Sequence, residues 1–166
     1  DAIGVLQQAV RDSYPELSRQ FMFEAARKAT EAQQYVGARE MLSKLLNQDP
    51  QNAEYLAAMA DTYGQAGDSR GLKQFYEEKI TTFEHASISG EARKTQIAGF
   101  RRGLITALTR LKEYQAAVDQ YVELLNTFPE DAGLPAESAL YAQRYGRQSQ
   151  LLDFYGRAVS RSPRDS

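Results

Sequence analysis

Three prolines, Pro50, Pro129 and Pro163, close three stretches of the chain that align with one another without gaps. Apolar residues recur twelve, eight and five positions before each proline: Ala38, Ala117 and Leu151; Leu42, Tyr121 and Tyr155; Leu45, Leu124 and Ala158. Pro129 and Pro163 are 34 residues apart, and Pro50 and Pro129 are 79 apart, which is two such periods and eleven extra residues. A period of this length predicts a solenoid, in which each unit is a pair of helices that buries its apolar face against its neighbours.

The pattern resembles the tetratricopeptide repeat family, whose units are antiparallel helix pairs of 34 residues with small residues where helices cross. Small or apolar residues fill the matching positions of the first helices: Ala25, Ala26 and Ala29; Leu104, Ile105 and Leu108; Ser138, Ala139 and Ala142. The chain departs from the family in having no Trp and in placing Glu84 where the second unit would have its proline. The resemblance implies an all-α fold, a right-handed α/α superhelix of antiparallel helix pairs.

The repeat also predicts the organisation of the chain. We expect a single domain over residues 1–166, with a half unit over 1–15, full units over about 19–52, 53–86, 98–131 and 132–165, and an insertion over about 87–97. Helices are expected over 2–14, 16–32, 36–47, 53–65, 69–83, 91–111, 114–126, 134–145 and 149–160. Asn52 is a predicted N-cap, and Gly67 is predicted to make the turn after the helix over 53–65.

Composition excludes several classes of function. The net charge is −2, so no overall positive field attracts nucleic acid or an anionic membrane. The chain has no Cys, which excludes thiolate metal sites, and no apolar run approaches the length of a membrane span. Its one His, His85, falls in a predicted loop with no catalytic motif around it. We therefore expect no enzyme activity, no cofactor and no metal.

Positive charge gathers on one predicted helix. Residues 91–112 contain six basic side chains and a single acidic one, Glu91. Arg102, Thr106 and Arg110 follow at intervals of four and share a face of that helix. Guanidinium groups bind carboxylates through paired hydrogen bonds, so this face is a candidate for acidic groups of a partner. The alternative is that these arginines form a solvated face or pair with Glu and Asp side chains on adjoining helices.

In the tetratricopeptide family the first helix of each pair lines a concave groove that binds partners, and Arg102, Thr106 and Arg110 match that face. The resemblance implies a groove that also includes Phe23, Arg27, Glu31, Asp61 and Gln65. Phe23 offers it an apolar contact, although burial beneath the N-terminal helix is the alternative. We expect a non-catalytic scaffold that binds a protein or peptide, acidic where it meets the arginines, with no nucleic acid or membrane partner. An RNA-binding helical repeat and an accessory region of a larger enzyme remain alternatives.

Overall fold

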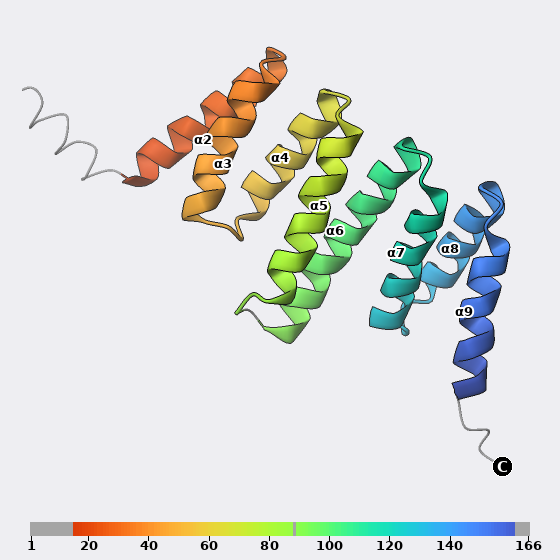
Figure 1. Cartoon of the computed structure of the whole chain (residues 1–166). Helices are drawn as coiled ribbons and strands as arrows, with labels where there is room; N and C mark the ends of the chain where they lie inside the picture. Colours follow the sequence, from red (N-terminus) through yellow and green to blue (C-terminus); the bar gives the residue numbers. More distant parts are fainter. Residues whose placement is uncertain (1–14, 88, 162–166) are drawn as a thin grey trace, which may run out of the picture. The chain divides into compact units, whose positions relative to one another are not determined.

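The computed structural model describes residues 15–87 and 89–161, and in these residues the chain forms eight α-helices (Figure 1). They divide into two compact units between Asp68 and Ser69. Within each unit, successive helices pack as antiparallel neighbours, so the all-α fold of sequential helix pairs is confirmed. The expected helix over 2–14 lies outside the described residues.

The first unit contains α2 (Pro15–Glu31), α3 (Tyr35–Gln48) and α4 (Ala53–Gln65). Apolar residues at helical spacing on α3 supply most of its core, together with small residues of α2: Ala26, Ala29, Ala38, Leu42, Leu45 and Leu46. The Asn52 side chain accepts hydrogen bonds from the backbone amides of Glu54 and Tyr55, at 3.1 and 3.2 Å, and so caps α4 as predicted. Gly67 has a positive φ of 68° in the turn after α4, which a residue without Cβ adopts at little cost.

The second unit contains α5 (Ser69–Glu84), α6 (Gly90–Arg110), α7 (Tyr114–Thr127), α8 (Gly133–Arg144) and α9 (Gln148–Arg161). The long helix expected over 91–111 is α6, which has 21 residues. Its first half extends along α5, where Phe100 packs edge-on against Phe83 with ring centroids 5.0 Å apart. Leu104, Ile105 and Leu108 continue the buried face of α6. The extra residues of the insertion therefore extend a helical hairpin.

A hydrogen bond between first helices recurs at the same repeat position in both units. In the first unit, the hydroxyls of Thr30 on α2 and Thr62 on α4 lie 3.0 Å apart, and both residues are buried. In the second unit, the hydroxyls of Thr109 on α6 and Tyr141 on α8 lie 2.7 Å apart. Thr30 and Thr109 stand twenty residues before Pro50 and Pro129, and both pairs are 32 residues apart in sequence. The two units thus use one packing register.

An ion pair also recurs at equivalent positions. Arg39 on α3 binds Asp68 at 3.0 Å, and Lys73 on α5 binds Glu113 at 2.6 Å, which raises the pKa of Lys73. The two pairs are separated by 29 and 40 residues, and the difference equals the eleven extra residues of the sequence. The repeat register therefore continues through residues 53–86 even though Glu84 replaces the proline. That the whole chain is one superhelical domain stays a prediction.

Candidate functional site

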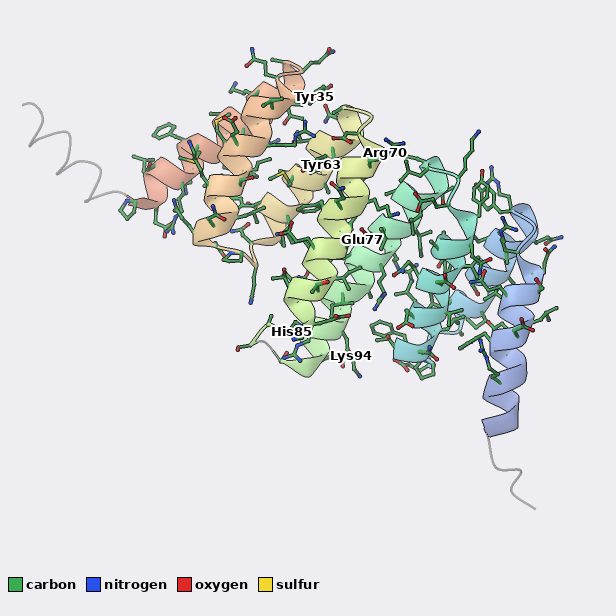
Figure 2. All side chains as sticks on the ribbon, in the orientation of Figure 1. Tyr35, Tyr63, Arg70, Glu77, His85 and Lys94 are labelled. Carbon is green, nitrogen blue, oxygen red and sulfur yellow. The ribbon has the colours of Figure 1, made fainter. Side chains whose placement is uncertain are left out.

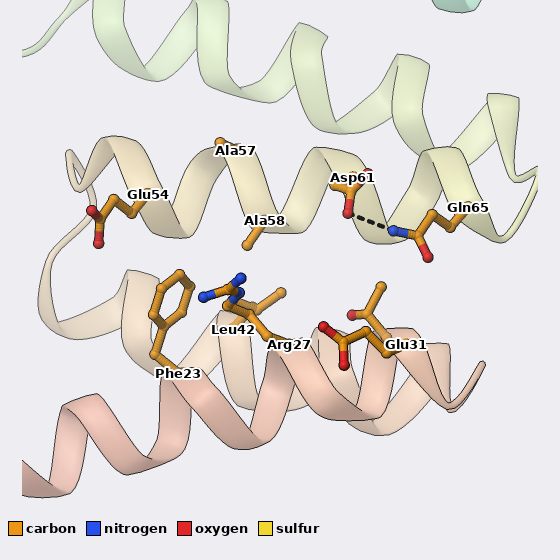
Figure 3. Close-up of a pocket in the computed structure, with 10 residues that line it drawn as sticks. Phe23, Arg27, Glu31, Leu42, Glu54, Ala57, Ala58, Asp61 and Gln65 are labelled. Carbon is orange, nitrogen blue, oxygen red and sulfur yellow. Dashed lines mark hydrogen bonds between the residues drawn. The ribbon is translucent and has the colours of Figure 1, made fainter.

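A cavity of about 340 Å³ lies in the first unit between α2 and α4 (Figure 3). From α2 it is lined by Phe23, Arg27, Thr30 and Glu31; from α3 by Leu42; and from α4 by Glu54, Ala57, Ala58, Asp61 and Gln65. A second hollow, lined by Gln20, Phe23, Glu24, Arg27 and Glu54, shares three of these residues. The two form one continuous trough, here called the α2–α4 groove. It contains five of the eight residues that the sequence proposed for a binding site.

The groove is open because one side chain at its base is short. Leu42 lies on α3 eight residues before Pro50, and opposite it on α4 is Ala58. At the equivalent positions of α5 and α6, the ring of Tyr76 covers Gly103 so closely that an added Cβ on Gly103 would lie 2.6 Å from the Tyr76 hydroxyl. At the next junction, the hydroxyl of Tyr121 donates a hydrogen bond to Glu137 at 3.1 Å. A tyrosine thus fills both junctions in the second unit where leucine leaves space in the first.

Part of the α2–α4 groove, from Phe23 to Ala57 and Ala58, is apolar. Phe23 is half-buried, and its ring centroid lies 5.0 Å from that of Tyr55 in a tilted arrangement. Ala57 and Ala58 continue the apolar surface along α4 (Figure 3). The alternative that Phe23 packs beneath the helix expected over 2–14 lies outside the described residues. In the described part of the chain, Phe23 contacts α4 and keeps one side toward the groove.

The charged side chains of the groove are mostly acidic. Arg27 is paired within α2 to Glu24 at 3.3 Å, and both side chains are more than half exposed. Asp61 accepts a hydrogen bond from the Gln65 amide at 2.7 Å. The carboxylates of Glu31 and Glu54 form no hydrogen bond or ion pair with any described residue. With the Arg27–Glu24 pair neutral, Glu31, Glu54 and Asp61 give the groove a net negative charge.

The other three proposed site residues lie on α6 in the second unit. Arg102 pairs with Glu137 of α8 at 2.8 Å and with Asp131 at 3.9 Å, and the hydrogen bond that it donates to Glu137 raises the pKa of Arg102. The Thr106 hydroxyl donates to the backbone carbonyl of Arg102 in its own helix. Arg110 is exposed and forms no ion pair with any described residue. Of the two arginines, only Arg110 is therefore available to a partner without breaking an existing ion pair.

Two of the basic side chains of α6, Arg101 and Arg102, are paired with carboxylates from other parts of the second unit. Arg101 lies 3.7 Å from Glu84 and 3.8 Å from Glu123, and Arg93 donates to the backbone carbonyl of Ala86 at 2.6 Å. Sequence reasoning found these basic residues but could not place their acidic partners, which lie on other helices. The alternative role, pairing between adjoining helices, is what the structure shows for Arg101 and Arg102.

Features associated with catalysis are sparse. His85 is exposed just after the end of α5 (Figure 2). No group of three or more His, Cys, Asp or Glu side chains that could hold a metal ion occurs among the described residues. None of the described helices is both long and apolar enough to cross a membrane.

Sequence reasoning missed four of the residues that complete the groove: Thr30, Leu42, Glu54 and Ala58. A signal for Leu42 was present, because the position eight before the proline changes from tyrosine in two of the aligned stretches to leucine in the first. That change in side-chain length marks the junction that is open.

No protein-family model and no curated protein sequence matches the chain. Three solved structures of MamA are similar over most of their length, each with 14% sequence identity. MamA of AMB-1 covers 91% of this chain and 95% of its own, with a TM-score of 0.47. A mutant of MamA covers 89% and 99% with a TM-score of 0.31, and MamA of MSR-1 covers 87% and 97% with a TM-score of 0.30. These scores are too low to place the chain in a family or to assign it a role.

Proposed function

We propose that this chain is a tetratricopeptide-like, non-catalytic binding protein that holds a segment of a partner protein in the α2–α4 groove. The observation that carries the proposal is the groove itself, which combines an apolar stretch with charged side chains, those of Glu31 and Glu54, that take no part in helix packing. Concave sites with an apolar surface and a few directed polar groups are the usual places for ligands. Side chains that hold the fold together could have closed the space, as Tyr76 and Tyr121 do at the equivalent junctions.

The size of the groove sets the length of the bound segment. Glu54 and Gln65 mark its two ends on α4, and eleven residues of helix span about 16 Å at 1.5 Å per residue. An extended chain advances about 3.3 Å per residue, so about five residues of a partner fit. Arg110 and the exposed edge of Arg102 on α6 form a second contact surface in this proposal, separate from the groove.

The proposal is tested by filling the groove with the two residue types that occupy the equivalent junction of the second unit. Leu42→Tyr combined with Ala58→Gly reproduces the Tyr76 and Gly103 pair in the first unit. We expect the double variant to fold, because the equivalent junction accommodates that pair, and to lose peptide binding. Because the chain has no Cys, Ala57→Cys carries a single environment-sensitive dye in the groove, and Lys44→Cys on α3 carries the control dye.

Binding is measured with immobilised peptide arrays and then with the labelled protein in solution. A peptide that binds in the groove changes the fluorescence of the dye at position 57 and leaves the dye at position 44 unchanged. It also loses at least tenfold in affinity for the filled variant, as expected when an apolar side chain is excluded from its pocket. Peptides that bind the wild-type and filled proteins equally well would show that the groove is not the site.

A further inference from the structure

The charge of the α2–α4 groove indicates which chemical class of partner it binds. Each of its two ends carries carboxylates: Glu54 lies beside Phe23 at one end, and Glu31 and Asp61 lie together at the other (Figure 3). Glu31 and Glu54 make no contact with a cation in the described residues, in contrast to Glu137, which is bound by Arg102. In the second unit Arg102 neutralises the Glu137 carboxylate, whereas the carboxylates of Glu31 and Glu54 in the groove face open space.

We propose that the α2–α4 groove binds a basic segment of a partner protein, with Lys or Arg side chains at both ends and an apolar residue between them. This inference rests on the proposed peptide-binding function and names its partner class. It reverses the sequence expectation of an acidic partner, which depended on Arg102 and Arg110. Arg102 is paired with Glu137 and Asp131 in the second unit, and in the α2–α4 groove the charges without an ionic partner are the carboxylates of Glu31 and Glu54.

The spacing of the carboxylates fixes the spacing of the basic side chains. Glu54 and Asp61 are seven residues apart on α4, which places them about 10 Å apart along the helix axis. In a polyproline II segment, side chains three residues apart share a face and are separated by about 9 Å along the chain. A motif of two basic residues separated by two others therefore matches the groove.

The middle of the groove accounts for the apolar residue. Ala57 and Ala58 line it on α4, and the Phe23 ring flanks them. A medium-sized aliphatic side chain of the segment fits against these residues and gains burial there. Arg27, whose guanidinium has more donors than its single bond to Glu24 uses, is placed to donate to a backbone carbonyl of the segment.

Three fluorescein-labelled peptides test the inference: Lys-Leu-Ala-Lys-Ala with blocked ends, and the same peptide with Gln or with Glu in place of both Lys. Fluorescence anisotropy at low and at high salt measures their affinity for the wild-type chain. We expect the Lys peptide to bind most tightly, the Glu peptide most weakly, and the preference to shrink as salt screens the charges.

Two variants assign the effect to the groove. Glu31→Gln with Asp61→Asn removes two charges while keeping side-chain shape, and we expect it to weaken binding of the Lys peptide about fivefold to thirtyfold, as for two partly exposed ion pairs. Glu40→Gln with Asp153→Asn removes the same charge at exposed positions outside the groove and should change affinity by less than about twofold.

The possible results separate this inference from the proposed function. Binding of the Glu or Gln peptide as tightly as the Lys peptide, abolished by Leu42→Tyr with Ala58→Gly, would overturn the basic partner and leave the peptide groove in place. Loss of affinity in the control variant equal to that in the groove variant would also overturn it. Binding of all three peptides that is indifferent to the filled groove, or no binding at all, would overturn both.

Discussion

The close approach of Tyr76 to Gly103 gives the sharpest test of the packing that distinguishes the junctions. Gly103 lies in the interior of α6, and a Cβ added to it would lie 2.6 Å from both Cε2 and the hydroxyl oxygen of Tyr76. The same helix offers a matched control, because a Cβ added to Gly99 would meet nothing within 4 Å. Gly103→Ala and Gly99→Ala therefore make the same chemical change in the same helix, but only Gly103→Ala creates a steric clash.

The expected magnitudes follow from two opposing terms. Replacing Gly by Ala in a helix interior stabilises by about 1 kcal/mol, and we expect Gly99→Ala to raise the free energy of unfolding by about that amount. Gly103→Ala gains the same term but displaces the Tyr76 ring from its contacts with Phe75 and Phe100, at centroid distances of 5.5 and 6.4 Å. Forcing a packed side chain to move costs about 1–3 kcal/mol, so Gly103→Ala should be neutral or destabilise by up to about 2 kcal/mol.

Urea unfolding followed by far-ultraviolet circular dichroism measures both effects by linear extrapolation. A Tyr76→Ala background completes the cycle, because without the ring Gly103→Ala should become as stabilising as Gly99→Ala. The coupling energy between positions 76 and 103 should then be about 1–3 kcal/mol. If Gly103→Ala stabilises the protein that retains Tyr76 as much as Gly99→Ala does, the ring does not occupy the space above Gly103 and the account of filled and open junctions is wrong.

Three further predictions concern the α4 cap, the recurring hydrogen bond and the pH dependence of stability. Asn52→Ala should lower the unfolding free energy by about 1 kcal/mol because α4 loses its cap. Gln34→Ala is the control, because the Gln34 side chain caps α3 with no hydrogen bond, and it should cost at most about 0.3 kcal/mol in the same urea assay. Equal losses in the two variants would contradict the capping role of Asn52. Thr30→Val and Thr62→Val should each cost about 0.5–1.5 kcal/mol, because each removes the bond between the two hydroxyls while the remaining hydroxyl keeps its contact with a carbonyl of its own helix. The double variant loses that shared bond only once, so its cost should be less than the sum, and strict additivity in the double-mutant cycle would show that the hydroxyls do not interact. Burial, and secondly the charge of the neighbouring Glu137 carboxylate, raises the pKa of Tyr121 above its value in the unfolded chain. The stability that Tyr121 contributes is therefore complete below pH about 10 and is lost as the pH rises further. Tyr121→Phe should make the alkaline fall in unfolding free energy less steep by up to about 1.4 kcal/mol per pH unit, and an unchanged slope would refute the assignment.

The sequence predicted the helices well because their boundaries depend on local chemistry and on a repeated pattern. The predicted helix over 53–65 matches α4 residue for residue, since Asn52 caps its start and Gly67 allows the turn after its end. The long helix expected over 91–111, a stretch that contains no proline, is the 21-residue α6. Such signals lie within a few residues of the feature that they specify.

The site was harder to predict because it depends on residues that meet across helices. Phe23, Arg27 and Asp61 were grouped through the family resemblance and all three line the α2–α4 groove, but the space between them depends on the length of Leu42, on a third helix. Arg102 carries a strong sequence signal, yet its role depends on Glu137, which is 35 residues away. Side-chain pairing across helices decides which charges remain accessible, and a single sequence shows only which charges exist.

The recurring contacts suggest how a repeat of this kind separates stability from recognition. The Thr30–Thr62 and Thr109–Tyr141 bonds keep one register between first helices, and the positions that make them are buried or half-buried in both units. The position eight before the proline instead decides whether a junction is filled. A leucine at this position leaves out the aromatic ring but is still buried, as Leu42 is at the base of the groove. It therefore keeps the apolar contact between the helices while leaving space above it. Substitution at this one position can therefore open or close a binding groove while the neighbouring packing contacts persist, which is why we expect Leu42→Tyr with Ala58→Gly to affect binding more than stability.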